Sequence, residues 1–312
     1  MCGIVGILGR APVAEQLVDS LKRLEYRGYD SAGVATLEGD HLERRRAEGK
    51  LKNLEQRLRA EPLSGHTGIG HTRWATHGKP TESNAHPHAT ENVAVVHNGI
   101  IENFRELREA LEKRGAVFNT ETDTEVVVHL VDEQLRRGLG PVEAVRKTLS
   151  EIRGAFALGF IFKGKDDLMI GARNGPPLAI GYGDGEMYLG SDAIALGSFT
   201  NTISYLEDGD WVVLTRTGAT IYDKDNAIVH RDPIRHTAAT SLVDKANYRH
   251  FMAKEIHEQP EVVGHTLARY VDMAAERVAL PLKLPFDFND IQRISITACG
   301  TASYAGYVAK YW

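Results

Sequence analysis

Cysteine and positive charge are both in short supply in this chain of 312 residues. Only two cysteines occur, Cys2 and Cys299, near opposite ends of the sequence. They provide no disulfide framework, which excludes the small disulfide-stapled folds and fits a reducing compartment. The 37 lysines and arginines are outnumbered by 42 aspartates and glutamates, which gives a formal net charge of −5. The chain therefore lacks the basic footprint of a protein that binds nucleic acid.

Long hydrophobic runs are missing as well. The longest uncharged, largely apolar stretch runs from Gly154 to Phe162 and is far too short to cross a bilayer. No positive residue precedes the first apolar run, which breaks at Gly9 and Arg10, so the N-terminus does not read as a signal peptide. The sequence thus predicts a cytoplasmic protein without a membrane partner, and its length suits about two domains.

The N-terminus carries the first candidate for chemistry. Removal of the initiator methionine would make Cys2 the terminal residue, which then holds a thiol nucleophile and an α-amine together. The α-amine has a pKa of about 7.7–8.0 and can accept the thiol proton, an established arrangement for covalent catalysis. Gly3 to Ile7 reads as a short buried strand that would hold Cys2 at its end. A small core residue is the other interpretation of Cys2.

The segment Arg27 to Gly33 (RGYDSAG) is a loop with two glycines next to a predicted strand over residues 34–37. Its arginine and aspartate are compatible with a binding site. They are equally compatible with a turn that carries a solvated ion pair, and the segment alone leaves both interpretations open.

A second loop, RWATHG, follows a predicted strand over residues 68–72. The guanidinium of Arg73 is well shaped to bind a carboxylate with two hydrogen bonds, and Thr76 and His77 supply further hydrogen-bonding groups nearby. The α-carboxylate of an amino-acid substrate needs such an arrangement. The alternative is structural, with Trp74 in the core and Arg73 in an ion pair.

The tripeptide His97-Asn98-Gly99 is predicted to end a strand over residues 93–96. The amide of Asn98 and the backbone N–H of Gly99 can both point at one oxygen atom, which would make an oxyanion hole. A plain Asn-Gly turn is the alternative.

Asp123 lies just before an amphipathic helix predicted over residues 126–137. Either Thr122 or Asp123 could cap that helix. Asp123 could instead hold the ammonium group of a substrate, and the residue alone does not decide between these roles.

Histidine is abundant between residues 71 and 97, where His86-Pro87-His88 suggests a metal site. No cysteine or carboxylate stands at the spacing that zinc sites use. We therefore expect loop and core histidines, no bound metal and no cofactor.

Helical and strand patterns are mixed along the chain. Helices are predicted over residues 12–25, 50–59, 100–114, 126–137 and 143–152, and strands over residues 155–162, 168–172, 178–181, 187–190, 211–215 and 220–222. Mixed strands with clustered helices favour a layered α+β core.

Five segments, taken in order, resemble one family. The chain start and the segments RGYDSAG, HTRWATHG, HNGIIEN and TETDTE are together similar to the glutaminase domain of the glutamine–fructose-6-phosphate aminotransferase (isomerising) family, also called glucosamine-6-phosphate synthases. The resemblance covers residues 2–223. It implies an N-terminal-nucleophile hydrolase, whose fold is a four-layer α/β/β/α sandwich.

The resemblance also implies a role for each matching residue. Cys2 would be the nucleophile that forms a γ-glutamyl thioester with L-glutamine, and its own amine would be the base. The implied substrate contacts are Arg73, Thr76 and His77 for the α-carboxylate, Asp123 for the α-ammonium, Asn98 and Gly99 for the oxyanion, and Trp74 on a loop that closes over glutamine.

Residues 224–285 are predicted to be a linker with helices. The polar stretch up to residue 239 reads as irregular. A helix over residues 248–259 is expected to end at Pro260, and a second helix is expected over residues 261–279.

Residues 286–312 are predicted to contain a buried strand over 293–298, a glycine-containing loop and a helix, a combination that can bind phosphate at the helix start. They resemble the beginning of the family's sugar isomerase domain. This implies Thr301 and Ser303 as part of an incomplete phosphosugar site, with Ala302 where the family commonly has serine. Cys299 is expected to pack at the strand end.

One strand and one helix cannot form a doubly wound sheet, and the last helix has no C-cap signal, so we expect a truncated chain. It would support only the glutaminase half-reaction. In the full-length enzyme, which we expect to be a homodimer, the ammonia would convert fructose 6-phosphate to glucosamine 6-phosphate for amino-sugar synthesis.

Three alternatives remain open. One is an amidotransferase of the amidophosphoribosyltransferase type, against which Tyr29 and the isomerase-like tail argue. The second is a non-catalytic glutamine-binding module, and the third, more distant, is a metal hydrolase.

Overall fold

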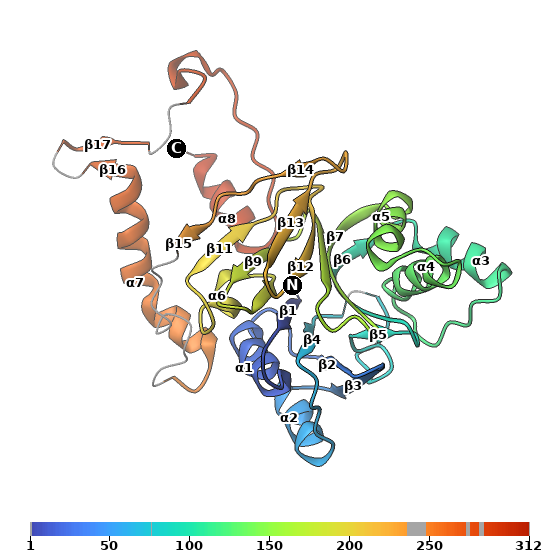
Figure 1. The fold of residues 1–312 in the computed structure, drawn as a ribbon. Helices are drawn as coiled ribbons and strands as arrows, with labels where there is room; N and C mark the ends of the chain where they lie inside the picture. Colours follow the sequence, from blue (N-terminus) through green and yellow to red (C-terminus); the bar gives the residue numbers. More distant parts are fainter. Residues whose placement is uncertain (1, 76, 236–247, 273–274, 281–283, 312) are drawn as a thin grey trace. The chain divides into compact units, whose positions relative to one another are not determined.

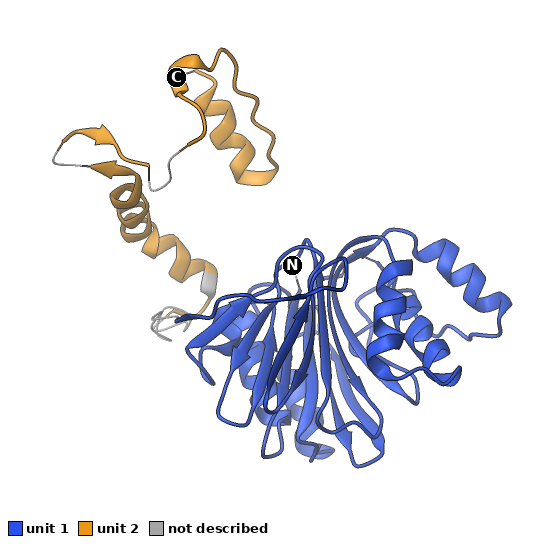
Figure 2. Ribbon diagram, turned by 45° about the horizontal axis from the view of Figure 1, so that its top comes forward, with its two compact units in different colours: residues 1–244 blue, residues 245–312 orange. Residues whose placement is uncertain are grey.

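The computed structural model describes residues 2–75, 77–235, 248–272, 275–280 and 284–311. Two compact units divide the chain, one formed by residues 1–244 and the other by residues 245–312 (Figure 2). Among the described helices, none is long and apolar enough to cross a membrane.

Two antiparallel sheets form the centre of the first unit (Figure 1). The larger has eight strands in the order β15-β11-β9-β10-β1-β4-β2-β3, so that both edges of β1 are paired. Its strands are β1 (Gly3–Leu8), β2 (Ser31–Glu38), β3 (His41–Glu48), β4 (Thr67–Arg73), β9 (Ala179–Tyr182), β10 (Met187–Gly190), β11 (Thr202–Tyr205) and β15 (Ile234–Arg235).

The smaller sheet has seven strands in the order β14-β13-β12-β8-β7-β6-β5. The two longest, β6 and β7, pair along their whole length. Its strands are β5 (His88–Ala89), β6 (Val93–Ile101), β7 (Gly154–Phe162), β8 (Met169–Asn174), β12 (Trp211–Thr215), β13 (Gly218–Tyr222) and β14 (Ile228–Val229).

The continuous apolar run of β1 is explained by burial on both faces. Val5 and Ile7 belong to the core cluster beneath α1 (Ala14–Leu24). Ile4 and Leu8 belong to the cluster between the two sheets. Because successive side chains of a strand point to opposite faces, a strand covered on both sides has no polar positions.

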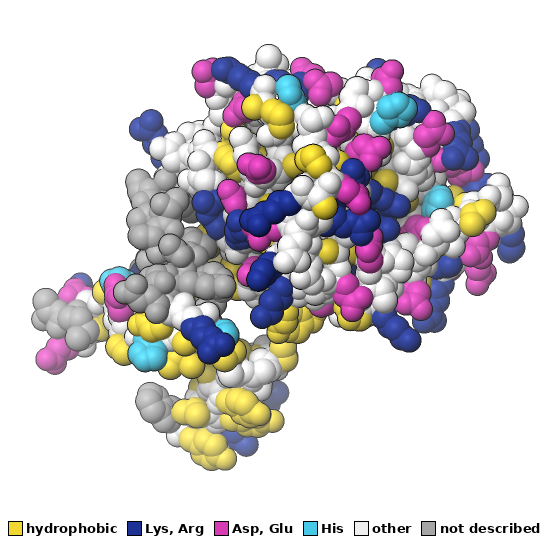
Figure 3. All heavy atoms as spheres, turned by 90° about the horizontal axis from the view of Figure 1, so that it is seen from below, with side chains coloured by type: hydrophobic (Ala, Val, Ile, Leu, Met, Phe, Trp, Pro, Cys, Tyr) yellow, Lys and Arg dark blue, Asp and Glu magenta, His cyan; other side chains and the backbone are white. Residues whose placement is uncertain are grey.

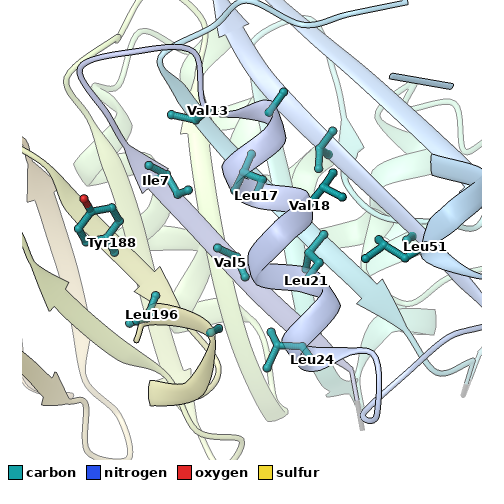
Figure 4. Close-up of a cluster of buried hydrophobic side chains, with 14 of the residues drawn as sticks. Val5, Ile7, Val13, Leu17, Val18, Leu21, Leu24, Leu51, Tyr188 and Leu196 are labelled. Carbon is teal, nitrogen blue, oxygen red and sulfur yellow. The ribbon is translucent and has the colours of Figure 1, made fainter. Parts of the chain in front are cut away.

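One helical layer covers the eight-stranded sheet. It consists of α1, α2 (Leu51–Ala60) and the short α6 (Ala193–Leu196). The side chains of Leu17, Leu21 and Leu24 recur at helical spacing and face the strand below, as Figure 4 shows.

A second helical layer covers the seven-stranded sheet. Its helices are α3 (Phe104–Lys113), α4 (Glu125–Arg136) and α5 (Pro141–Glu151), and Val131 of α4 shares a buried cluster with Phe160 of the sheet. The layers therefore follow the order α/β/β/α, and the predicted four-layer fold is confirmed.

Several details of the first unit differ from the sequence prediction. The helix predicted over residues 100–114 begins only at Phe104, and β3 and β11 have no predicted counterpart. Strand β6 does not end at residue 96 but continues through Asn98 and Gly99 to Ile101, because these residues pair with β7. The irregular stretch expected from residue 224 contains β14 and β15, which pair with β13 and β11. The first unit thus continues past residue 223.

The second unit differs more. Helix α7 (Phe251–Tyr270) runs through Pro260, where the sequence predicts a break, and it is followed by the hairpin β16 (Val271–Asp272) and β17 (Arg277–Val278) instead of further helix. The predicted helix over residues 261–279 is therefore wrong beyond Tyr270. A proline removes one backbone donor, and this helix tolerates that loss.

The buried strand predicted over residues 293–298 is also wrong. These residues have no regular secondary structure and are exposed, because no described strand lies beside them to complete a hydrogen-bonded ladder. The helix predicted next is present as α8 (Gly300–Ala309).

Candidate active site

A cavity of about 310 Å³ opens at the start of β1 and the end of β6. Its wall brings together residues from parts of the chain that are far apart in sequence. The predicted site residues that line it are Cys2, Arg73, Trp74, His77, Asn98, Gly99 and Asp123. Thr76 lies outside the described residues.

Cys2 stands immediately before β1, so its position is fixed by a strand at the centre of a sheet. The backbone N–H of Trp74 donates a hydrogen bond to the sulfur atom, with an N–Sγ distance of 3.2 Å. The Trp74 carbonyl lies 3.5 Å from the same sulfur. Burial raises the pKa of the Cys2 thiol, although the Trp74 amide opposes this.

The oxyanion candidates Asn98 and Gly99 lie opposite Cys2. The Nδ2 atom of Asn98 donates to the Cys2 carbonyl at 3.1 Å, which uses one of its two N–H groups. Gly99 has a φ of +122°, and a Cβ atom there would lie 2.0 Å from the Ala155 carbonyl oxygen. Only glycine fits at this position.

A buried histidine fixes the orientation of the Asn98 amide. Nε2 of His71 lies 3.0 Å from Oδ1 of Asn98 and 2.9 Å from the carbonyl oxygen of His97. Both partners are acceptors, so His71 carries its proton on Nε2. Burial lowers the pKa of His71 to about 3, so the ring stays neutral. Asn98 therefore keeps its Nδ2 group toward Cys2.

The Arg73 guanidinium is almost fully buried and is held by the loop that follows it. It donates to the backbone carbonyls of His77, Gly78 and Lys79, the last two at 3.1 and 3.0 Å. Contacts with the described residues use three of its five N–H groups. Burial lowers the pKa of Arg73, but the group stays cationic at any physiological pH.

Trp74 is not a core residue. Its side chain is 49% exposed, and its ring lies edge-on to Tyr29 with the ring centroids 5.7 Å apart. The structural alternative for Trp74 is therefore wrong. His77 faces the same cavity, and its ring lies edge-on to Phe104.

Asp123 does not cap helix α4. The residue at the N-cap position is Thr124, and it makes no side-chain cap hydrogen bond. One carboxylate oxygen of Asp123 instead accepts a hydrogen bond from the Ile101 amide at 2.8 Å, at the end of β6. The side chain is buried in the cavity wall, so an anion faces the space beside Cys2.

Four of the histidines between residues 71 and 97 are buried, namely His71, His86, His88 and His97. The rings of His71 and His86 lie tilted with their centroids 4.2 Å apart, and His86 and His97 both hydrogen-bond the hydroxyl of Thr124. Burial lowers the pKa of His71, His86 and His97. Within the described part of the chain, no group of three or more histidine, cysteine, aspartate or glutamate side chains is arranged to hold a metal ion.

Further residues in the cavity wall and beside it lacked a decisive sequence signal. Arg27 of the RGYDSAG loop lines the cavity and forms an ion pair of 2.6 Å with Asp192. Asp30 of the same loop accepts a hydrogen bond from the Ala75 amide. This loop is thus part of the site. Pro176 and Pro177 close one wall, and nothing in their local sequence indicated that.

The second unit holds the other predicted site residues. Thr301 and Ser303 lie in the first turn of α8, where the Ser303 hydroxyl donates to the Gly300 carbonyl at 2.7 Å. Cys299 is exposed rather than packed. The phosphosugar role of Thr301 and Ser303 stays a prediction.

Comparisons with known proteins agree with this site. Residues 71–198 match the model of a glutamine amidotransferase domain. A glutamine–fructose-6-phosphate aminotransferase (isomerizing) from Bradyrhizobium diazoefficiens is 84% identical over all 312 residues, and one from Brucella abortus is 63% identical over the same residues. Each alignment covers 100% of this chain and 51% of the relative. The chain therefore spans about half the length of the curated relatives it matches.

A solved structure shares the fold of the first unit. The glutamine phosphoribosylpyrophosphate amidotransferase from B. subtilis, in complex with ADP and GMP, is similar with a TM-score of 0.63 and 27% identity. The similarity covers 73% of this chain and 50% of that one. The cavity described above lies within the first unit, to which this likeness applies.

Proposed function

Because residues 71–198 match a glutamine amidotransferase domain and a curated relative is 84% identical, we propose that residues 2–223 of this chain hydrolyse glutamine to glutamate and ammonia at Cys2. The observation that supports this most is the convergence of a cation, an anion and a nucleophile on one cavity. Arg73 and Asp123 match the two charges of an amino acid, and Cys2 lies where the side-chain amide would reach. Trp74 and His77 complete the wall.

The identity of the base follows from what surrounds the sulfur. Among the described residues, Cys2 Sγ hydrogen-bonds only with the backbone of Trp74, so no histidine or carboxylate is placed to take its proton. Burial favours the neutral thiol, so a base is needed. Removal of Met1 would supply it as the α-amine of Cys2.

The reaction then proceeds in two steps. The amine takes the thiol proton, and the thiolate attacks the side-chain amide carbon of glutamine. The second N–H of Asn98 and the N–H of Gly99 stabilise the oxyanion. The carbon–nitrogen bond of the substrate's side-chain amide breaks. The protonated α-amine of Cys2 gives its proton to the leaving nitrogen, and ammonia leaves. Water, activated by the same amine, hydrolyses the thioester and releases glutamate.

The function of the longer protein follows from its relatives. Relatives with 84% and 63% identity are named glutamine–fructose-6-phosphate aminotransferases (isomerizing). We propose that the ammonia made at Cys2 converts fructose 6-phosphate to glucosamine 6-phosphate in the full-length enzyme, and that residues 286–312 begin the domain that binds the sugar. A homodimer and a cytoplasmic location stay predictions.

The decisive test compares the two cysteines. Cys2→Ala should abolish glutamate release from glutamine, and a variant that retains Met1 should be inactive as well, with intact mass as the check on the N-terminus. Cys299→Ala, exposed in the second unit, should retain full activity. Turnover by Cys2→Ala, or by protein with a blocked amine, would refute the mechanism.

A second experiment separates the candidate acceptors. The full-length protein should consume fructose 6-phosphate together with glutamine and leave phosphoribosyl pyrophosphate untouched. The opposite preference would favour the amidophosphoribosyltransferase type, to which the B. subtilis structure belongs by name. Glutamine binding without any turnover in protein whose Met1 is removed would favour a binding module.

A further inference from the structure

We propose that Asn84 is a positioning residue for substrate recognition, because it ties the loop that holds Arg73 to the segment that carries Asp123. This inference rests on the proposed function of the cavity. Asn84 itself does not line the cavity, so it acts only through the residues that it holds.

The contacts of Asn84 reach both segments. Its Nδ2 group donates to the Lys79 carbonyl and to a Glu121 carboxylate oxygen, each at 3.0 Å. Its Oδ1 atom accepts from the Glu121 backbone N–H, also at 3.0 Å. The same Glu121 oxygen accepts from the Lys79 amide at 3.2 Å. Asn84 and Glu121 thus form a closed brace between residues 79 and 121.

One end of this brace supports the cation. Lys79 O, which Asn84 holds, also accepts a hydrogen bond from Arg73 at 3.0 Å. The preceding Gly78, whose carbonyl holds Arg73 as well, has a φ of +78°, and a Cβ atom there would lie 2.9 Å from the Asn84 amide nitrogen. The loop therefore passes directly over the Asn84 amide, and its backbone carbonyls stay directed at the Arg73 guanidinium.

The other end supports the anion. Glu121 lies two residues before Asp123, and this segment is fixed further by Glu125, which accepts the backbone N–H groups of Asn119 and Thr120 at 2.8 Å each. The brace therefore sets the separation of Arg73 from Asp123. In an amino acid, the carboxylate and the ammonium group are attached to one carbon atom. The distance between Arg73 and Asp123 must therefore match the fixed distance between these two groups.

The chemistry of the side chain explains why asparagine is required. Asn84 is only 2% exposed, and its amide donates both N–H groups and accepts at its oxygen. Aspartate has the same shape, but it has no donors and would place its charge against Glu121. A buried group that loses its partners is costly, and the loop would shift to regain them.

Asn84 makes no described contact with the residues that carry out the reaction. This predicts which kinetic constant its substitution changes. The described contacts of Asn84 do not include Cys2, Asn98 or Gly99, which are placed by β1 and β6. Asn84→Asp should therefore weaken glutamine binding and raise KM on the order of tenfold. We expect kcat to change less than about threefold, since the groups that stabilise the transition state remain in place.

Asn103→Asp is the matched control. Asn103 also bridges two segments with its amide, because it donates to Glu151 O and accepts from the Arg153 N–H, both at 2.9 Å. This brace lies outside the cavity wall. Asn103→Asp should lower the thermal midpoint of the protein about as much as Asn84→Asp does. It should leave KM for glutamine unchanged.

A comparison of two substrates gives a ratio of kcat/KM values, which a loss of protein stability would not change. Glutaramate, which is glutamine without the α-amino group, can use Arg73 but not Asp123. The ratio of kcat/KM for glutamine to kcat/KM for glutaramate should fall in Asn84→Asp, because the ammonium group gains less when the two charges are out of register. If Asn84→Asp does not fold, Glu121→Ala, which removes the acceptor oxygen of an exposed side chain in the same brace, should move KM and this ratio in the same direction.

The outcomes separate this proposal from the proposed function. If the unaltered chain hydrolyses glutamine while Asn84→Asp and Glu121→Ala both keep its KM and its substrate ratio, the brace has no role in recognition. A fall in kcat at constant KM would equally overturn the proposal. If the unaltered chain with a free Cys2 amine does not hydrolyse glutamine, the function itself fails instead.

Discussion

The two units of this chain differ in what their apolar side chains contact. In the first unit, clusters of leucine, isoleucine, valine and phenylalanine are buried above, below and between the sheets. In the described part of the second unit, no hydrophobic side chain is buried, and residues such as Ile256, Leu267 and Ile294 are at least half exposed. Figure 3 shows hydrophobic side chains at the surface in yellow. A hydrophobic pattern in a sequence therefore does not by itself mean a core.

The sequence-based predictions of helices and strands are mostly correct in the first unit and fail more often in the second. The strand over residues 3–7 and the helix over residues 12–25 were predicted from apolar spacing, and both exist because a neighbouring layer covers them. The strand predicted over residues 293–298 has apolar residues at every second position. It is absent because no described strand pairs with it.

The largest contrast should appear in stability. Leu21→Ala removes a fully buried side chain of α1 and should cost about 2–5 kcal/mol in the free energy of unfolding. Leu267→Ala, on the half-exposed face of α7, should stay within about 0.5 kcal/mol. Chemical denaturation of both variants measures the difference. A similar loss at both positions would mean that α7 has a packed partner in solution.

A second contrast concerns two asparagines. Asn98→Ala removes a donor from the proposed oxyanion hole and should lower kcat by about 10²–10³-fold with little change in KM. Asn289→Ala, exposed in the second unit and bonded only to Asp287 among the described residues, should leave both constants unchanged. Steady-state glutaminase assays decide the matter, and a normal kcat for Asn98→Ala would remove the oxyanion role.

The third contrast between the units concerns the free energy of unfolding at low pH. Burial alone would raise the pKa of Glu125, but the neighbouring His129 and hydrogen bonds from Asn119 and Thr120 lower it from 4.5 to about 2. Because the folded pKa is depressed, this contribution is present above pH 4.5 and is lost as pH falls from about 4.5 to about 2. Glu125→Gln should therefore destabilise the protein at pH 7 by about 1–3 kcal/mol and make little difference near pH 2.

The control for this prediction is Glu255→Gln, on an exposed position of α7. It should leave the free energy of unfolding unchanged at both pH values. Equal effects of the two substitutions across the range would show that the hydrogen bonds of Glu125 do not stabilise the fold.

The smallest effect is expected from removal of the second unit. A chain that ends at residue 244 keeps every buried cluster of the first unit, so its thermal midpoint should stay within about 2 °C of that of the whole chain. Glutamate release should also persist, because every described cavity residue lies in the first unit. A large fall in the midpoint would show that the units stabilise each other.

The site illustrates the same limit of sequence reasoning at finer scale. Arg73, Asn98 and Asp123 were found because their chemical types suit an amino-acid substrate, and the fold brings them to one cavity. The bond from Asp30 to the Ala75 amide and the brace of Asn84 on Glu121 were not predicted. They join loops that are 45 and 37 residues apart, and no local pattern encodes such a pairing.

The pairing of β1 has a consequence for how the protein is made. Its two neighbours are β4, near residue 70, and β10, which begins at Met187, so the first strand to leave the ribosome is completed only after most of the first unit has been translated. We therefore expect Cys2 to take its place in the cavity only after Met187–Gly190 has been translated.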